Sequence, residues 1–219
     1  MNKKTRKKYI LLVGAILMIS VLIMILYHFN ILPHRSYDNA YFGIETLKSS
    51  VDKDQDGIDD QSDILMNARN YINTHPKYKS VYYQGGYPDD GYGVCSDVVA
   101  FALKDAGYDL QVLVDEDIAA HPEDYDIEVA DANIDFRRVR NLLVYFQNHA
   151  LSLTTDIHDI EQWQGGDIVV FHEHIGIVSD KRNKQGIPFL IHHASPFQFR
   201  YEEDVLGRYE IIAHFRISE

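Results

Sequence analysis

The sequence predicts an α+β domain that follows a single membrane-spanning helix. Residues 95–106 and 136–146 have apolar side chains at helical spacing. The last third of the chain instead holds four short runs of β-branched and aromatic residues: GDIVVF, HIGIVSD, FLIHHA and YEIIAHFRI. Helices followed by closely spaced strands are typical of an α+β domain with a curled antiparallel sheet. The 219 residues, 46% of them hydrophobic, suit one such domain with appendages.

The first 27 residues predict a membrane anchor. Residues 1–8 form a basic tail without an acid, and residues 9–27 are uncharged and long enough to cross a bilayer as a helix. The basic tail predicts a cytoplasmic N-terminus and therefore an extracytoplasmic domain. No small-residue cleavage site or lipidation cysteine follows, so we expect a retained single-pass signal-anchor rather than a cleaved signal peptide. We interpret residues 28–51 as a tether.

Composition excludes some classes of function. The net charge is −12 although the N-terminal tail is basic, so the predicted domain is strongly acidic and lacks the footprint of a nucleic-acid-binding protein. One cysteine excludes an internal disulfide. Residues 108–134 are irregular and acidic, which favours a surface loop.

Residues 52–63, DKDQDGIDDQSD, match the D-x-D-x-D-G pattern of calcium-binding loops. Carboxylates recur at the positions that supply ligands, and Gly57 stands where the loop turns sharply. The predicted ligands are the side chains of Asp52, Asp54, Asp56, Asp60 and Asp63 and the carbonyl of Ile58. The twelfth position is Asp rather than Glu, which favours weak, structural calcium binding. The alternative is a solvated acidic turn.

The cysteine is the first candidate for chemistry. Cys95 precedes a helical apolar rhythm, and a thiol at a helix N-terminus is favoured as a thiolate. A cysteine nucleophile also needs a base and a group that orients the base. Histidines occur on two of the predicted strands: His172 and His174 on one, His192 and His193 on the next.

These strings together resemble a known family. Y-x-x-G-G at residues 82–86, C-S opening a helix, G-D-I-V-x-F, H-I-G-I-V and I-H-x-A-S are similar to the motifs of NlpC-type cell-wall cysteine peptidases, which belong to the papain-like superfamily. The similarity spans residues 78–217. It is strongest to an uncharacterised bacterial branch, a domain of unknown function, whose members carry GVCxDV, NIDFRR and HIGIVSD strings.

The resemblance implies a papain-like fold over residues 64–219 and a set of site residues. Cys95 would be the nucleophile, His174 the base and Tyr82 a hydrogen-bond donor. A polar residue on the next strand would orient His174, and His193 fits the I-H-x-A-S register better than His192. The usual C-S-G reads C-S-D here, so Asp97 either disfavours the thiolate or recognises a substrate amine. The backbone N–H of Cys95 or Ser96 would help to bind an oxyanion, and Arg137 or Arg138 a substrate carboxylate.

The resulting expectation is a membrane-anchored extracytoplasmic cysteine hydrolase, an amidase or endopeptidase, that acts on peptidoglycan stem peptides or cross-links. Catalysis would need no cofactor, and calcium would be structural. Two alternatives stay open. One is a zinc hydrolase that uses His172 and His174 with His192, His193 or His214 and Glu173 as the acid. The other is a non-catalytic, calcium-dependent wall-binding module on a degenerate peptidase fold.

Overall fold

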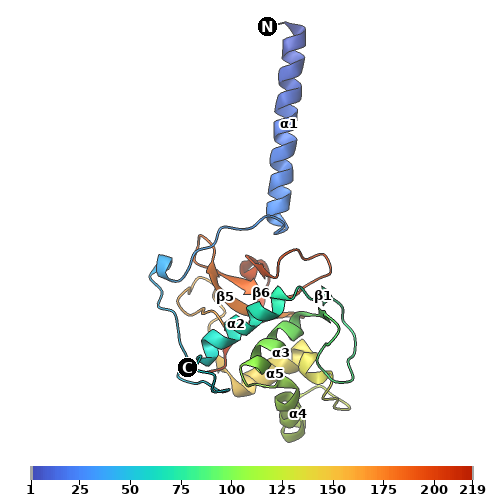
Figure 1. Cartoon of the computed structure of the whole chain (residues 1–219), viewed down its shortest axis with the longest axis vertical. Helices are drawn as coiled ribbons and strands as arrows, with labels where there is room; N and C mark the ends of the chain where they lie inside the picture. Colours follow the sequence, from blue (N-terminus) through green and yellow to red (C-terminus); the bar gives the residue numbers. More distant parts are fainter. Residues whose placement is uncertain (1, 219) are drawn as a thin grey trace. The chain divides into compact units, whose positions relative to one another are not determined.

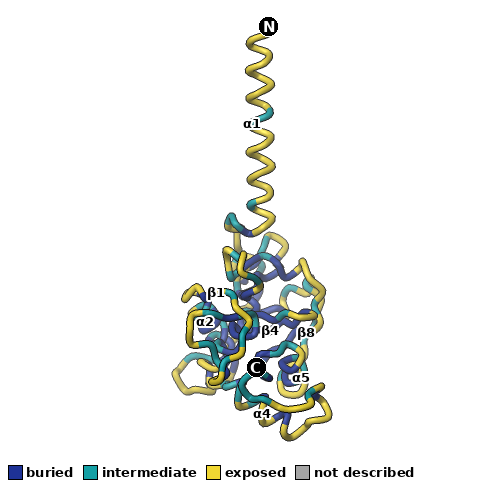
Figure 2. Tube along the Cα trace, turned by 90° about the vertical axis from the view of Figure 1, so that its right-hand side faces the viewer, coloured by how far each residue is buried: buried dark blue, intermediate teal, exposed yellow. Residues whose placement is uncertain are grey.

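The structure is a computed structural model that describes residues 2–218 (Figure 1). The chain divides into one unit that ends at Arg35 and a second that begins at Ser36. The first unit consists mainly of α1 (Lys3–His28), a helix without a buried residue (Figure 2). Among the described residues, α1 is the one helix that is long and apolar enough to span a membrane, and its most apolar window has a mean hydropathy of 2.9. The apolar segment predicted at residues 9–27 therefore lies within a longer helix that includes the basic tail.

The second unit contains four α-helices and two sets of strands. The helices are α2 (Asp60–Asn73), α3 (Cys95–Asp105), α4 (Leu110–Ala120) and α5 (Val139–His149). A parallel pair joins β1 (Lys77–Tyr78) to β2 (Tyr92–Gly93). Short 3₁₀ turns lie at Ala40–Phe42, Pro122–Asp124, Asp135–Arg137 and Leu206–Arg208.

The main sheet has six antiparallel strands in the order β3-β8-β4-β5-β6-β7. The strands are β3 (Leu151–Ser152), β4 (Ile168–Phe171), β5 (Ile175–Arg182), β6 (Pro188–Ile191), β7 (Glu202–Glu203) and β8 (Ile211–Arg216). Four of them coincide with the predicted strands, and β3 and β7 are additional two-residue edge strands. The predicted α+β class with an antiparallel sheet is confirmed.

The two faces of the sheet pack into two different cores, and this alternation positions the histidines. Figure 1 shows α2 and α3 crossing the part of the sheet that holds β5 and β6. Ile175 and Ile191 join the core that includes these helices, whereas Leu190 joins a second core on the other face. Because successive side chains of a strand point to opposite faces, His193 continues the helix-covered face and His192 continues the other face.

Residues from Tyr37 onward are part of the domain, so the predicted tether, residues 28–51, is shorter than expected. Tyr37 pairs with Arg182 at the end of β5. The guanidinium of Arg182 is fully buried, and Asn39 Oδ1 accepts from its Nε at 2.6 Å. A buried guanidinium must have its donors satisfied, and the segment before the acidic loop supplies one of the acceptors.

Candidate active site

Cys95 is the first residue of α3, and the residues around it favour a helix start there. Val94 is extended, and its N–H donates to Asp97 Oδ2 at 2.7 Å in the first helical turn. Position 93 requires glycine because a Cβ there would lie 2.1 Å from the Tyr71 hydroxyl. The thiol therefore lies at the amino end of an 11-residue helix, where the helix dipole favours negative charge.

Asp97 and Arg137 form a buried ion pair, which corrects the substrate-binding roles expected for both. Arg137 Nε donates to Asp97 Oδ1 at 2.7 Å and Nη2 donates to Oδ2 at 3.0 Å. The side chains are 0% and 3% exposed for Asp97 and Arg137. Arg137 Nη1 also donates to the carbonyl of Val81, at 2.8 Å. The pair thus ties the start of α3 to the tyrosine-rich segment, and neither charge faces a substrate.

The thiol of Cys95 is neutral at rest. Burial raises the pKa of this thiol to about 11, the N–H groups of Ile175 and Ser96 offset part of the shift, and the carboxylate of Asp97 adds to it. The sequence-based expectation that Asp97 disfavours a thiolate agrees with the direction in which Asp97 shifts the pKa of Cys95. A group with this pKa is almost entirely protonated near pH 7, so a base would have to remove its proton during attack.

His174 and His192 form a hydrogen-bonded pair. His174 directly precedes β5, and its Nε2 lies 2.8 Å from His192 Nδ1. The other nitrogen of His192 lies 3.1 Å from the Glu203 carboxylate on β7. Burial, with a contribution from the neighbouring His192 and His193, lowers the pKa of His174 to about 3. His174 is consequently a neutral imidazole at physiological pH, which is the form that accepts a proton.

His193 does not contact His174 through a hydrogen bond, so the preference for His193 as the orienting residue is corrected in favour of His192. The His193 ring lies edge-on to Tyr78 and Tyr201, with centroids 5.3 and 5.0 Å away. Its Nδ1 is buried without a hydrogen-bond partner. Burial lowers the pKa of His193 to about 4, and the neighbouring His192 adds to the shift. The reason for the reversal is strand alternation, which turns the two histidines to opposite faces.

The thiol of Cys95 and the ring of His174 both belong to residues near the start of β5. The N–H of Ile175 is near enough to the sulfur to affect the pKa of Cys95, and Ile175 directly follows His174. Across residues 2–218, no hydrogen bond joins Cys95 Sγ to an imidazole; His174 is bonded to His192 instead. Catalytic hydrogen bonds are often long without a substrate and shorten when it binds. The structure thus places Cys95 and His174 near the same end of β5 without a hydrogen bond between them.

The remaining predicted residues differ in their surroundings. The Ser96 hydroxyl is buried without a hydrogen-bond partner, beside Cys95. Tyr82 is 55% exposed, and its hydroxyl donates to Asp131 at 3.5 Å. Arg138 is partly exposed and pairs with the buried Asp135 at 2.9 Å. Arg138 thus remains accessible at the surface, unlike Arg137.

A cleft of about 400 Å³ opens beside the histidine pair. Its aromatic lining is Phe171 and Tyr209, and two carboxylates, Glu173 and Glu210, also line it. The remaining lining residues are His172, His174, His192 and Ala194. The cleft gives solvent and small molecules access to the rings of His174 and His192.

The histidines proposed for zinc do not form one ligand set, although His172, His174 and His192 line the same cleft. His214 stacks on Trp163 at 3.8 Å, and its Nε2 and Nδ1 are engaged by Asp167 and by the carbonyl of Thr154. Among the residues that the structure describes, the one His, Cys, Asp or Glu group with metal-ligand spacing is Asp52, Asp54 and Asp56. The geometry therefore gives no support to the zinc alternative.

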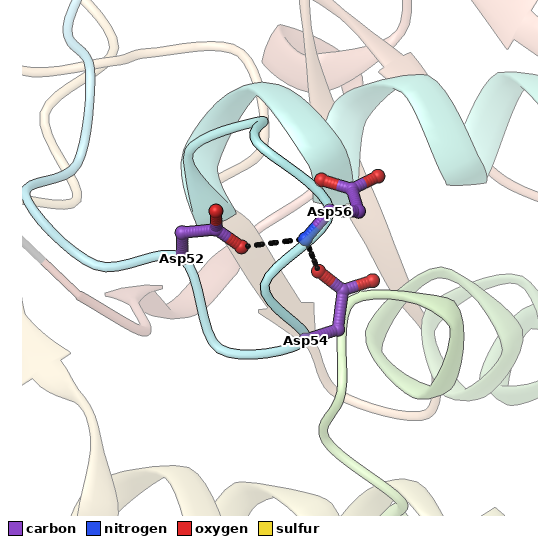
Figure 3. Close-up of side chains that lie close together, drawn as sticks. All are labelled: Asp52, Asp54 and Asp56. Carbon is purple, nitrogen blue, oxygen red and sulfur yellow. Dashed lines mark hydrogen bonds between the residues drawn. The ribbon is translucent and has the colours of Figure 1, made fainter.

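The acidic loop has the geometry of a cation site at its first three positions (Figure 3). Oxygens of Asp52, Asp54 and Asp56 lie within 4.8 Å of one another. The N–H of Asp56 donates to Asp52 and Asp54 at 3.2 Å each, as the dashed lines show. Gly57 has φ = 95°, which supports its predicted role in the sharp turn.

Two predicted ligands at the end of the loop differ from each other. Asp60 is buried at the start of α2, where it accepts from the N–H of Lys53 and from the Tyr108 hydroxyl at 2.8 and 2.5 Å. Its carboxylate is thus already occupied, and we correct its assignment as a calcium ligand. Asp63 is buried, and burial together with the charges of Asp56 and Asp54 raises its pKa to about 6. Asp63 thus feels the charges of Asp56 and Asp54, although it is not one of the three acids with metal-ligand spacing.

A family model described as "Domain of unknown function (DUF1287)" matches residues 65–217, more than half of the chain. The chain belongs to the DUF1287 family. A relative named "Uncharacterized protein YijF", from Escherichia coli (strain K12), is 38% identical over 150 residues, which cover 64% of this chain and 72% of that protein. No solved structure matches. The predicted membership of a domain-of-unknown-function branch is confirmed, and the resemblance to NlpC-type peptidases stays a prediction from motifs.

The DUF1287 match includes Cys95, His174 and His192 and begins after the acidic loop. It also includes two residues that the sequence analysis missed, Glu203 and Gln198, which contact His192. Their only local signal is an acidic pair shortly after the two histidines. The candidate active site thus lies within the family domain, whereas the candidate calcium loop precedes it.

Proposed function

We propose that this protein is a membrane-anchored cysteine hydrolase, an amidase or endopeptidase, that acts outside the cytoplasm on peptidoglycan stem peptides or cross-links. The observation that carries the proposal is the placement of a helix-start thiol, Cys95, beside the N–H of Ile175, the residue that directly follows His174 of the hydrogen-bonded His174–His192 pair. The papain-like, NlpC-type resemblance of the motifs supplies the substrate class. The basic residues at the start of α1 support an N-terminus on the cytoplasmic side.

The neutral resting states define the order of the chemistry. His174 accepts the thiol proton as Cys95 Sγ bonds to the substrate carbonyl carbon, and the backbone N–H at the start of α3 stabilises the oxyanion. The C–N bond then breaks, and the imidazolium gives its proton to the leaving amine. A water next attacks the thioester while His174 takes one of its protons. The acid is released, and the proton returns to the thiol.

The cleft beside His174 is the site that we assign to the substrate. Its aromatic walls suit the apolar part of a stem peptide, and the carboxylates of Glu173 and Glu210 suit an amine on that peptide. These acids take over the role of amine recognition that the sequence suggested for Asp97. Arg138 remains a candidate for a substrate carboxylate.

We also propose that the acidic loop holds a structural calcium ion. The side chains of Asp52, Asp54, Asp56 and Asp63 and the carbonyl of Ile58 would be its ligands, because calcium takes six to eight oxygen ligands. The raised pKa of Asp63 supports this assignment, since burial is its main cause and the charges of Asp56 and Asp54 add to it. The ion would fix the loop against the start of α2.

A non-catalytic wall-binding module is the second candidate. It is favoured by the raised pKa of Cys95 and by the lack, within the described residues, of a hydrogen bond from its sulfur to an imidazole. In this alternative the cleft binds a wall fragment and the thiol is inert.

The two candidates are separated by mass spectrometry of muropeptides incubated with the full chain in detergent, with and without calcium. The wild type is compared with Cys95→Ala and with Glu128→Gln, an exposed acid outside the site. The hydrolase predicts new cleavage products with the wild type and Glu128→Gln but not with Cys95→Ala. Binding to sacculi without any product from the wild type would favour the module, and equal products from all three would exclude Cys95 as the nucleophile.

A further inference from the structure

We propose that Glu203, acting through His192, fixes the proton of His174 on Nε2 and leaves Nδ1 as the free base. Glu203 is thus a positioning residue two hydrogen bonds away from the proton acceptor. The inference rests on the proposed function only where it makes His174 the base. The arrangement of the three side chains stands on contacts that do not involve Cys95.

Strand register brings Glu203 to His192. Glu203 pairs with Leu190 on β6, so the two residues share a face, and His192 lies two positions beyond Leu190 on that face. Glu203 and His192 are 8% and 2% exposed, and Oε2 lies 3.1 Å from Nε2. The carboxylate of Glu203 is buried on this two-residue edge strand, and a buried carboxylate needs a polar partner. The imidazole of His192 provides it.

The neighbouring Glu202 faces the other way and has separate partners. Its Oε1 accepts from Arg69 at 2.7 Å and its Oε2 accepts from Lys181 at 2.6 Å. The two adjacent acids therefore have distinct roles, since one is bound to cations and the other to an imidazole. This makes Glu202 a matched control for Glu203.

The hydrogen bonds determine where each proton lies. An ionised carboxylate only accepts hydrogen bonds, so His192 must donate to Glu203 from Nε2. A neutral His192 then has a lone pair on Nδ1, and the 2.8 Å contact requires His174 to donate from Nε2. The neutral ring of His174 consequently keeps its lone pair on Nδ1. That nitrogen is the one free to take a proton.

Gln198 holds the far end of this chain in place. The N–H of Ala194 donates to Gln198 Oε1 at 2.6 Å, which fixes the orientation of the amide. Its Nε2 lies 3.2 Å from the His192 carbonyl, 3.2 Å from His192 Nε2 and 3.4 Å from Glu203 Oε2. The two oxygens accept hydrogen bonds whichever tautomer His192 adopts, whereas a protonated Nε2 cannot accept one. The amide hydrogens are therefore directed to these oxygens, and the proton of His192 Nε2 remains directed to Glu203.

The charge of Glu203 also has a consequence for proton transfer. When Nδ1 of His174 takes a proton, the imidazolium donates to His192, and the carboxylate of Glu203 at the far end stabilises its positive charge. Without Glu203, neutral His192 would be free to carry its proton on either nitrogen. His174 would then populate the tautomer that has no lone pair on Nδ1.

The first test is spectroscopic and does not need a substrate. Two-bond ¹H–¹⁵N spectra are recorded on the full chain in detergent with ¹⁵N-labelled histidine, and the His174 and His192 signals are assigned with His174→Gln and His192→Gln. The wild type is expected to show both rings protonated on Nε2 at pH 7.5. Protonation of His174 on Nδ1 in the wild type would overturn the inference without any Glu203 variant.

Three variants complete the spectroscopic test. Glu203→Met keeps the volume and removes the acceptor, so the His192 and His174 signals should shift toward a mixture of tautomers. Glu203→Gln can still accept through its carbonyl oxygen and should retain the wild-type pattern, as should Glu202→Gln. Wild-type spectra in Glu203→Met, or the same loss in Glu202→Gln, would overturn the inference.

The activity arm separates this inference from the proposed function. With muropeptides, Glu203→Met should lower kcat at least about 10-fold with little change in KM, and Glu203→Gln should lie between it and the wild type. Failure of the wild type to release product would remove the proposed hydrolase and leave the tautomer result standing. A hydrolase whose kcat is unaffected by Glu203→Met would remove the role of Glu203 and leave the proposed function standing.

Discussion

Arg137 holds both carboxylate oxygens of Asp97 in the first turn of α3, through bonds of 2.7 and 3.0 Å. Because the pair is fully buried, removal of one partner leaves an uncompensated charge. We expect Arg137→Ala to lower the free energy of unfolding by about 3–5 kcal/mol. Urea unfolding of the full chain in detergent measures this loss.

Arg140→Ala is the matched control for that prediction. Arg140 pairs with Asp126 at 3.5 Å, and both side chains are exposed. Its loss should cost less than about 1 kcal/mol, as is usual for a surface pair. Equal effects of the two substitutions would contradict a structural role for the Asp97–Arg137 pair.

The second prediction concerns the reactivity of the thiol. Because burial raises the pKa of Cys95 to about 11, the thiolate fraction should grow about tenfold per pH unit from pH 7 to pH 10. The rate of alkylation by iodoacetamide should rise in proportion, and the single cysteine makes the mass change unambiguous. A plateau of the rate near pH 7 would instead indicate a preformed thiolate–imidazolium pair.

The third prediction concerns acid stability. The lowered pKa of His193, about 4 in the folded protein against 6.5, means that the unfolded state binds more protons between these values. The free energy of unfolding therefore falls as pH drops through this window, by up to about 3 kcal/mol from this group. His193→Phe keeps a ring between Tyr78 and Tyr201 but cannot titrate, so its stability should fall less steeply from pH 6.5 to pH 4. Identical slopes for the variant and the wild type, measured by urea unfolding, would refute this account of His193.

The fourth prediction concerns calcium. At 100 times its dissociation constant, an ion bound only by the folded state adds about 2.7 kcal/mol of stability. The gain in Tm between chelator and millimolar calcium should be larger at pH 7.5 than at pH 5, since the pKa of Asp63 is raised to about 6 and its proton must leave before it binds the ion. Asp56→Asn should abolish the gain, and Glu128→Gln should keep it. Retention of the gain in Asp56→Asn would exclude the proposed loop site.

Local patterns in the sequence predicted most of the secondary structure. The four strand-like runs and the helix after Cys95 were recognisable because their periodicity is set by which face is buried. Helix α4 was missed because three consecutive acids lie between its buried Val114 and Ile118, and the segment was interpreted as loop. Asp109, which caps this helix, was the overlooked signal.

The site was predictable in its residue types but less so in its partners. Asp97 and Arg137 are 40 positions apart, and a run of arginines on a helix usually faces solvent, so nothing local indicated that one of them is buried. His192 and His193 were distinguishable only by strand register, which depends on the pairing of β5 with β6. Glu203 lies on a two-residue strand that has no periodicity of its own.

The central claim is that Cys95 and His174 act as one catalytic unit, and a double-mutant cycle on muropeptide cleavage tests it most directly. Residues that act as a unit show strongly non-additive losses. We predict that Cys95→Ala and His174→Ala each lower kcat/KM by at least about 10³-fold, and that the double variant is no slower than either single variant. Additive losses in the double variant, or near-wild-type cleavage by either single variant, would contradict the claim.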